Sequence, residues 1–220
     1  MRSLSHDLRT PLNSALGYAI MIEDCIEDDA PKEEIIDCAK NIQTAVQRLV
    51  EMLDKSTQLA HITAGNIDIH STKISFSDLL EKTKASFRKK HNGNPLIIEN
   101  NVTSHQSVFG DFSLLKQALE ELLENALIFK SGKVVFECLV EDEHIYLTIA
   151  DDGRGFDDEQ REQLLSPFKQ SRDAKSLGAG CGVGWNIAEG LIKLHKGKLT
   201  IKNNNSGTLI RITLPNPDKL

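Results

Sequence analysis

The 220-residue sequence lacks any apolar run close to the roughly 18 residues that suggest a membrane-spanning helix. Its first residues also lack the successive basic, apolar and small-residue zones of a signal peptide. We therefore expect this fragment to be soluble and to make no contact with a membrane.

Basic residues are outnumbered by acidic ones, 26 to 32, and there are only four cysteines. The formal net charge is -6 at pH 7, and nucleic-acid-binding proteins normally carry a clustered basic face, so no nucleic-acid partner is expected. The cysteines form no Cys-x-x-Cys pair and have no histidine at zinc spacing, which favours free thiols over a metal site or a disulfide framework. A reducing, cytoplasmic location fits this pattern best. The cysteines are Cys25, Cys38, Cys138 and Cys181.

What is present is the composition of an ordinary soluble protein, 40% hydrophobic and 26% charged, with room for two modest domains or one large one. The first 26 residues carry an apolar stripe at the spacing of one helix face. It consists of Leu4, Leu8, Leu12, Ala15, Ala19, Ile22 and Ile26. After a polar break at residues 27–31, a second stripe follows in steps of mostly three and four, close to a coiled-coil repeat. It consists of Ile35, Cys38, Ile42, Ala45, Leu49, Met52 and Leu59.

Two antiparallel helices of this kind cannot bury both stripes against each other, because a two-helix hairpin leaves an apolar seam open. A second copy closes that seam by forming a four-helix bundle, so the pattern predicts a homodimer. The alternative is a hairpin whose seam packs against the rest of its own chain.

The segment Ala64-Gly65-Asn66 has the chemistry of a helix C-cap and ends the second helix. We place the domain boundary there, with one domain at residues 1–66 and another at residues 67–220. In the second domain the pattern predicts strands at residues 95–102, 133–140, 144–150, 198–202 and 208–214, and helices at residues 77–89, 112–129, 158–165 and 183–194. This mixture is typical of a two-layer α/β sandwich, with a mixed sheet covered by helices on one face.

The first helix carries a polar strip around a histidine. At roughly 100° per residue, His6 lies about 200° around the helix from Leu4, so its imidazole points to solvent, and Thr10 shares that face. Asp7 can orient one ring nitrogen by hydrogen bonding and leave the other as a neutral nucleophile. Pro11 removes the helical hydrogen bond to the carbonyl of Asp7, so a bend is expected beside the histidine. Taken alone, such a histidine is most often an ordinary solvated side chain.

The pattern Ser-x-x-His-Asp-x-Arg-Thr-Pro-Leu at residues 3–12 resembles the H box of sensor histidine kinases. The resemblance implies that His6 accepts the γ-phosphoryl group of ATP and later gives it to an aspartate of a response-regulator receiver domain. It also implies that Asp7 is the acid/base partner of His6, and that Thr10 positions water when the kinase acts as a phosphatase. Because the chain begins only five residues before His6, we expect a longer parent protein in which a sensor domain or a membrane anchor comes first.

Asp151, Gly153 and Gly155 follow a predicted strand. A carboxylate can accept a hydrogen bond from an exocyclic amine, and glycines let the backbone approach a flat ring. An Asp-Gly turn is by itself usually only a turn. The Asp-x-Gly-x-Gly pattern, however, resembles the first glycine box of the ATPase fold shared by histidine kinases, heat-shock protein 90 and DNA gyrase, in which the aspartate reads adenine.

Gly180, Gly182 and Gly184 precede a predicted helix, and such a junction can aim backbone N–H groups and the positive helix end at phosphate. This run is similar to the second glycine box of the same fold. Between the two glycine boxes, the segment Pro-Phe-Lys-Gln around Phe168 resembles the F box, which implies that residues 157–179 form an ATP lid.

Glu121 and Asn125 lie four residues apart on one predicted helix face, where a carboxylate and an amide oxygen can both serve Mg²⁺. Their segment, Glu-Leu-Leu-Glu-Asn-Ala, resembles the N box. With the H box followed by four nucleotide boxes in family order, the chain is identified as a member of the sensor histidine kinases. The resemblance implies a helical dimerisation and phosphotransfer domain followed by an ATP-binding domain, with ATP and Mg²⁺ as cofactors.

Three positions depart from the family pattern. Ile128 stands where a lysine is frequent and removes one phosphate contact, which Arg172 or Lys175 can replace. Asp152 replaces a frequent asparagine, and Trp185 stands where a leucine is usual. Two other functions stay open. One is an ATPase of this fold outside the kinases, although this reading leaves the H box unexplained. The other is a phosphatase-only protein or a non-catalytic dimeric scaffold, which agrees with the loss of a phosphate contact at Ile128.

Overall fold

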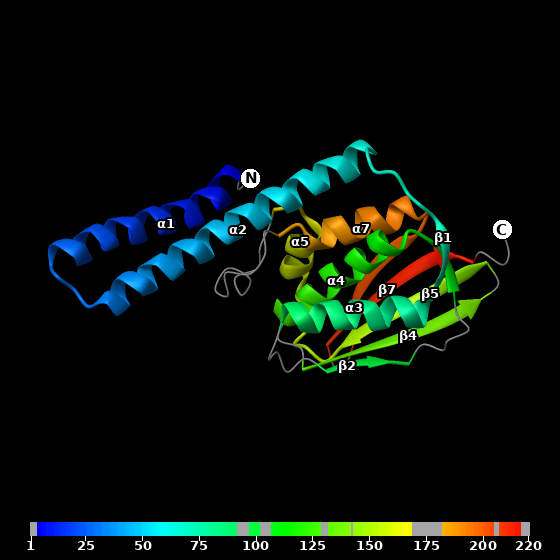
Figure 1. The fold of residues 1–220 in the computed structure, drawn as a ribbon. Helices are drawn as coiled ribbons and strands as arrows, with labels where there is room; N and C mark the ends of the chain where they lie inside the picture. The colour runs from blue at the N-terminus through cyan, green and yellow to red at the C-terminus, as the bar shows by residue number, and fades with distance from the viewer. Residues whose placement is uncertain are drawn as a thin grey trace. The chain divides into compact units, whose positions relative to one another are not determined.

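The computed structural model describes residues 4–91, 97–101, 107–128, 132–141, 143–168, 182–204 and 207–216. The chain forms two compact units, Met1–Gln58 and Leu59–Leu220. Figure 1 traces their elements in chain order. Within the described ranges, no helix is both long enough and apolar enough to cross a membrane.

The first unit is built from two long helices, α1 (Leu4–Glu27) and most of α2 (Lys32–Ala64). α1 continues through Pro11, so any bend there does not break the helix. Every member of the stripe predicted for α2 is buried or half-buried. Cys38, Ala45 and Met52 are the most enclosed, with 6%, 6% and 7% of their surface exposed. The coiled-coil spacing therefore identified the inner face of α2 correctly.

The stripe predicted for α1 is partly wrong. Leu12 and Ile26 are 56% and 64% exposed, and Ala19 is exposed as well. Each of these residues directly follows an inner residue of α1 and is therefore turned about 100° away from α2. The inner, half-buried positions of α1 recur in steps of three and four at Leu8, Pro11, Ala15, Tyr18, Ile22 and Cys25.

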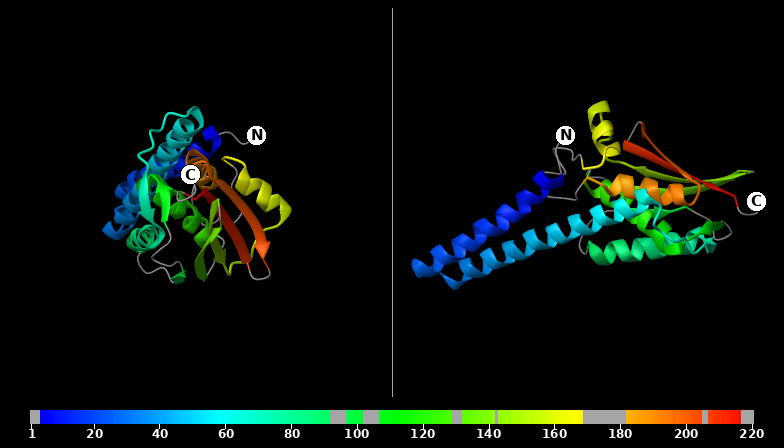
Figure 2. Two further views of the ribbon diagram at one scale, coloured as in Figure 1. Left: turned by 90° about the vertical axis from the view of Figure 1, so that its right-hand side faces the viewer. Right: turned by 90° about the horizontal axis from the view of Figure 1, so that it is seen from above.

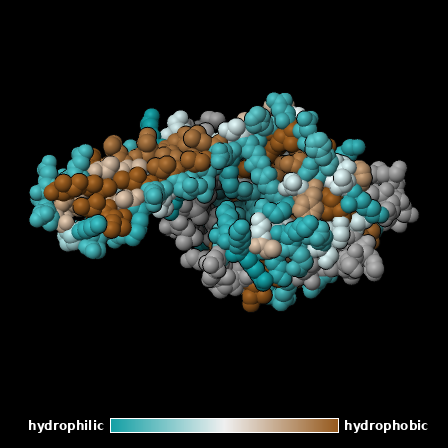
Figure 3. Space-filling view, in the orientation of Figure 1, coloured by the Kyte–Doolittle hydropathy of each residue, from teal (hydrophilic) through white to brown (hydrophobic). Residues whose placement is uncertain are grey.

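A second apolar line stays open on this hairpin, as expected for two helices without a partner. Figure 3 shows apolar surface running along both helices. Large apolar side chains that are 42–64% exposed make up this open seam, namely Leu12, Leu16, Ile20 and Ile26 on α1, and Ile36, Val46, Val50 and Leu53 on α2.

α2 ends as its sequence predicts. Gly65 has a φ of 72°, the N–H of Asn66 donates to the carbonyl of His61 at 3.0 Å, and the N–H of Gly65 donates to that of Ile62 at 3.1 Å. Ile62 is only 9% exposed, and a side chain added at Gly190 would overlap it. The last turn of α2 therefore packs within the second unit.

The second unit alternates strands and helices. Its described strands are β1 (Thr72–Ser75), β2 (Ile97–Asn100), β3 (Ser107–Gly110), β4 (Lys133–Glu141), β5 (His144–Asp151), β6 (Lys198–Asn204) and β7 (Gly207–Pro215). Its described helices are α3 (Phe76–Lys90), α4 (Phe112–Ile128), α5 (Asp158–Leu165) and α7 (Gly184–Leu194).

Five strands form a mixed sheet in the order β2-β4-β5-β7-β6. β2 pairs with β4 in parallel, and the other neighbours are antiparallel. Figures 1 and 2 show α3, α4 and α7 together on one face of this sheet. Alternate residues of β5, Ile145, Leu147 and Ile149, are 1%, 1% and 3% exposed and belong to the core. The predicted two-layer α/β sandwich is confirmed.

Sequence reasoning missed the small second sheet, in which β1 and β3 pair antiparallel. Each strand has four residues, and their buried apolar members, Ile74 and Val108, are single positions rather than an alternating run. Such short segments cannot be told from loops by periodicity.

Candidate functional site

The proposed phosphoacceptor lies in the first turns of α1. The side chain of His6 is 63% exposed, whereas that of Asp7 is 15% exposed. Nδ1 of His6 lies 3.5 Å from Oδ1 of Asp7, at the outer limit of a hydrogen bond. Nε2 is then the ring nitrogen that faces away from the carboxylate. Thr10 is exposed one turn further along, so this strip can present a nucleophilic nitrogen to a phosphoryl group.

In the second unit, residues of α4, β5, α5, α7, β6 and β7, together with the loop after β5, line a hollow. Two residues predicted to bind nucleotide, Asn125 of α4 and Asp151 of β5, meet in its wall. The wall consists of Asn125, Ala126, Asp151, Phe156, Leu164, Trp185, Ile201, Thr208 and Ile210.

Asp151 is fixed at the end of β5 with only 9% of its surface exposed. Its Oδ1 accepts the N–H of Gly153 at 2.9 Å and that of Thr208 at 3.3 Å. Both bonds end on Oδ1, which leaves Oδ2 to accept a hydrogen bond from an exocyclic amine in the hollow. Gly153 is itself buried beside this carboxylate.

The loop after Asp151 is held close to β6 and β7. Gly155 has a φ of 68° and Gly207 one of 152°, and a side chain on Gly207 would overlap the Asp151 carbonyl oxygen. Oδ1 of Asn203 accepts the N–H of Phe156 at 3.1 Å, and Nδ2 of Asn203 donates to the carbonyl of Phe156. These contacts hold the first glycine box against the sheet. Sequence reasoning did not predict that Asn203 would bind this loop.

The second glycine box leads into the amino end of α7. Gly182 has a φ of 71°, and Val183 caps α7 without any side-chain hydrogen bond. The cap residue therefore supplies no side-chain hydrogen bond to the first N–H groups of this helix, and N–H groups at a helix amino end can bind phosphate. The carbonyl of Gly182 accepts the N–H of Phe168 at 3.0 Å, which joins the F box to this box. Gly180 lies outside the described residues, as do Arg172 and Lys175.

α4 brings Glu121 and Asn125 to the start of α7. A Cβ on Gly184 would lie 2.7 Å from Oε2 of Glu121 and 3.8 Å from Oδ1 of Asn125, so both oxygens border the same residue. Glu121 is 8% exposed, and Nδ2 of Asn125 is buried without a hydrogen-bond partner in the described part of the chain. A carboxylate and an amide oxygen beside a helix amino end, where phosphate can bind, fit Mg²⁺, which takes oxygen ligands and keeps several waters.

The described residues hold no group of three or more histidine, cysteine, aspartate or glutamate side chains that could bind a metal ion. A Mg²⁺ ion at Glu121 and Asn125 would therefore need phosphate and water oxygens to complete its shell, the arrangement that Mg²⁺ commonly has at nucleotide sites.

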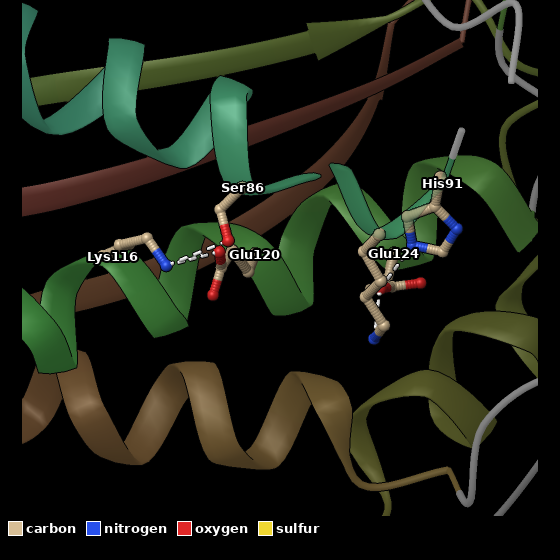
Figure 4. A network of polar contacts seen from close by, with 6 residues as sticks. Ser86, His91, Lys116, Glu120 and Glu124 are labelled. Carbon is tan, nitrogen blue, oxygen red and sulfur yellow. Dashed lines mark hydrogen bonds and ion pairs between the residues drawn. The ribbon is translucent and has the colours of Figure 1, made fainter. Parts of the chain in front are cut away.

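Glu124, in the same N-box segment, instead anchors α4 to α3. Its Oε1 accepts hydrogen bonds from Lys90 Nζ at 2.8 Å and from His91 Nε2 at 2.7 Å, and Figure 4 shows Glu124 beside His91. A second tie runs from Lys116 of α4 to Ser86 of α3, 3.2 Å between Nζ and Oγ. Burial opposes the ionisation of Glu124, but Lys90 and His91 hold its pKa below the ordinary value.

The amino end of α4 is capped by Asp111. Its Oδ1 accepts the N–H groups of Ser113 and Leu114 at 2.9 and 3.2 Å, and its Oδ2 accepts that of His70 at 3.1 Å. The N–H of Asp111 donates to Nε2 of His195 at 2.9 Å. Burial opposes ionisation, but these backbone N–H groups hold the pKa of Asp111 below its ordinary value. The helix that carries Asn125 is thus fixed at both ends.

Sequence reasoning did not find the sheet wall of the hollow. Ile201 of β6 and Thr208 and Ile210 of β7 form it. The alternation of apolar residues predicts one buried face for each of these strands. It does not predict which strand borders a ligand.

Two family models match the chain. The His Kinase A (phospho-acceptor) domain matches residues 1–65. The family described as histidine kinase-, DNA gyrase B-, and HSP90-like ATPase matches residues 110–218. The first match contains His6 and the second contains the hollow.

Curated relatives agree with these matches. The chain is 26% identical to the autoinducer 2 sensor kinase/phosphatase LuxQ of Vibrio parahaemolyticus, over 100% of the chain and 26% of that protein. It is also 26% identical to the signal transduction histidine-protein kinase BaeS of Escherichia coli, over 98% of the chain and 46% of that protein. The chain thus spans about a quarter to a half of the length of these relatives.

Solved structures share the fold. The Acinetobacter baumannii histidine kinase AdeS aligns with a TM-score of 0.75 at 23% identity, covering 96% of this chain and 97% of that one. Full-length ShkA in complex with AMPPNP aligns with a TM-score of 0.68 at 20% identity, covering 96% of this chain and 44% of that one.

The second unit is therefore an ATP-binding domain of the histidine kinase type, preceded by a phosphoacceptor hairpin. The chain belongs to the sensor histidine kinases, the ATP-dependent phosphotransferases of two-component signalling.

Proposed function

We propose that this chain transfers the γ-phosphoryl group of ATP to His6 and then to an aspartate of a response-regulator receiver domain. The observation that carries the proposal is an exposed His6 beside Asp7 in a chain whose other unit has a hollow with Asp151 and Asn125 in its wall. We assign dimerisation and phosphotransfer to a domain at residues 1–66, and ATP binding to a domain at residues 67–220.

The first transfer is a displacement at phosphorus. The lone pair of His6 Nε2 forms the N–P bond, the bond from the γ-phosphorus to the bridging oxygen breaks, and ADP leaves. The ring then carries a positive charge, and its Nδ1–H points to the Asp7 carboxylate, which lies 3.5 Å away. Asp7 thus holds the reactive tautomer before transfer and stabilises the charged ring after it.

At the nucleotide, Oδ2 of Asp151 would accept the adenine amine, and the backbone N–H groups at Gly182 and Gly184 would contact phosphate. Gly153, Gly155 and their neighbours keep the loop close to the base. Mg²⁺, when bound, supplies neutralisation of phosphate charge, and Glu121 and Asn125 are the residues proposed to hold it.

We also propose a homodimer, formed across the open seam of the hairpin, and a phosphatase activity in which Thr10 positions water against the phosphorylated regulator. The exposed apolar residues of α1 and α2 support the dimer. The name of the relative LuxQ, a sensor kinase/phosphatase, supports the double activity.

A second function is favoured by one residue. Ile128 ends α4 where a lysine is frequent in the family, so one phosphate contact is missing from the N box. A phosphatase-only protein or a non-catalytic dimeric scaffold would tolerate this change, because neither needs productive binding of the triphosphate.

Incubation with γ-labelled ATP and Mg²⁺ tests the proposal. We expect acid-labile, alkali-stable label in the parent and in His61→Gln, a matched control at an exposed histidine of α2, and none in His6→Gln. Nucleotide affinity should be the same in all three proteins. No labelling of a parent that binds ATP would favour the scaffold or phosphatase-only function.

A further inference from the structure

Buried polar atoms without a partner gather at the hollow. In the described part of the chain, three buried side-chain polar atoms have no hydrogen-bond partner: Asn125 Nδ2, Trp185 Nε1 and Asn186 Oδ1. Asn125 and Trp185 both line the hollow. Leaving a buried polar atom unpaired is unfavourable, so such atoms in a native protein indicate positions where a bound ligand can supply the hydrogen-bond partner.

Trp185 is the strongest of these cases. It is the single tryptophan of the chain, it lies in the first turn of α7, and only 3% of its surface is exposed. The family usually has a leucine here, which offers apolar surface but no donor. The indole N–H of Trp185 is therefore an addition made by this chain to the wall of its nucleotide site.

Asp151, Asn125 and Thr208 bring oxygen atoms to the wall, but in the described part of the chain none of them is within hydrogen-bond reach of this N–H. Oδ1 of Asp151 already accepts two backbone N–H groups, and most of the other lining side chains, such as Ile201 and Ile210, are apolar. The wall thus presents Asp151 as an acceptor and Trp185 as a donor to whatever fills the hollow.

We propose that Trp185 Nε1–H donates a hydrogen bond to an unprotonated ring nitrogen of the adenine, and so acts as a specificity-determining residue beside Asp151. Adenine offers both complements, an exocyclic amine for the carboxylate and ring nitrogens for the indole. Guanine carries a carbonyl where adenine has its amine and an N–H at the adjoining ring nitrogen. The inference rests on ATP binding in this hollow.

The proposal can be tested by calorimetric titration of the 220-residue chain. The ligands are ATP and its 1-deaza, 3-deaza and 7-deaza analogues. Each analogue replaces one ring nitrogen by a C–H group. We expect the parent to bind one analogue about three- to tenfold more weakly than ATP, the size of one neutral hydrogen bond. Trp185→Phe, which keeps an aromatic ring, should bind ATP more weakly by a similar factor and no longer distinguish it from that analogue.

A second measurement needs no variant. Since the chain has one tryptophan, a ¹⁵N-labelled sample gives one indole N–H resonance. ATP should move this resonance downfield, and the discriminating analogue should not. Equal affinity of the parent for ATP and all three analogues, or discrimination retained by Trp185→Phe, would overturn the role of Trp185 alone. Failure of the parent to bind ATP at all would overturn the nucleotide assignment together with it.

Discussion

Asp151 shows how much the proposed nucleotide site depends on single hydrogen bonds. Its carboxylate is buried, and two backbone N–H groups hold one oxygen in place. The neighbouring Asp152 has a different task, because its Oδ1 accepts the N–H groups of Gly132 and Lys133 at 2.7 and 2.8 Å. The departure from the family at Asp152 is therefore a structural contact at the start of β4.

Asp151→Asn should weaken ATP binding about tenfold to a hundredfold, because a charged hydrogen bond contributes about 1.5–3 kcal/mol. GTP binding should change much less, so selectivity for adenine falls. Calorimetric titration of both nucleotides measures this, with Asp152→Asn as the matched control. Equal affinities of the parent for ATP and GTP would count against the role of Asp151.

Thr10 separates the two proposed activities. It lies one turn from His6 on the exposed side of α1, where its hydroxyl can hold a water against a phosphoaspartate docked on the hairpin. Thr10→Ala should keep autophosphorylation within a few-fold of the parent and slow dephosphorylation of the cognate regulator about tenfold or more. Loss of autophosphorylation with regulator dephosphorylation unchanged would make Thr10 a structural support of His6 instead.

At the scale of elements, α4 is the helix that carries Asn125 of the proposed ATP site, and ionised groups hold the position of this helix. Asp111 caps its amino end, and Glu124 ties it to α3. The pKa values of both carboxyls are lowered in the folded chain. Their contribution to stability is therefore full above the unfolded pKa values and is lost as the pH falls through the folded ones.

Asp111→Asn should lower the free energy of unfolding at neutral pH by about 1–3 kcal/mol, because a charged acceptor of three backbone N–H groups is replaced. The variant should also lose less stability than the parent below the ordinary aspartate pKa of 3.8. Urea unfolding followed by Trp185 fluorescence at several pH values measures both effects. Asp78→Asn, at a carboxylate that is 56% exposed, is the control. An unchanged acid profile in Asp111→Asn would contradict this account.

How far the sequence predicts the elements depends on the length of each pattern. The stripe from Ile35 to Leu59 extends over several helical turns and identified its buried face correctly. In α1, leucines and isoleucines occupy both the inner face and the open seam, so apolar character alone could not separate Leu8 from Leu12.

The candidate site follows the same logic. Asp151 and Asn125 were found because local motifs mark them, and the fold brings them to one wall. Thr208, Ile210 and Asn203 reach the site only through the pairing of β7 with β5 and β6, which no local pattern encodes.

At the scale of the molecule, the open seam predicts an association between copies. Val46 and Val50, each 45% exposed, lie on the α2 part of this seam. Val46→Glu combined with Val50→Glu should convert the dimer into a monomer, since two charges in an apolar interface each oppose burial by several kcal/mol, of order 2–4. Light scattering with size-exclusion chromatography measures the mass. Arg48→Glu, about 200° around the helix from both valines, should stay dimeric. A monomeric parent would contradict the proposal.

The central claim is that ATP phosphorylates His6 on the nitrogen that faces away from Asp7. NMR of a ¹⁵N-histidine-labelled chain, treated with ATP and Mg²⁺ and kept at alkaline pH, identifies the phosphorylated nitrogen among the seven histidines. We predict one phosphohistidine, with the N–P bond at Nε2 of His6, and no such signal in His6→Gln. Phosphate on Nδ1 of His6 or on another side chain, or no phosphohistidine in a chain that binds ATP, would contradict the account.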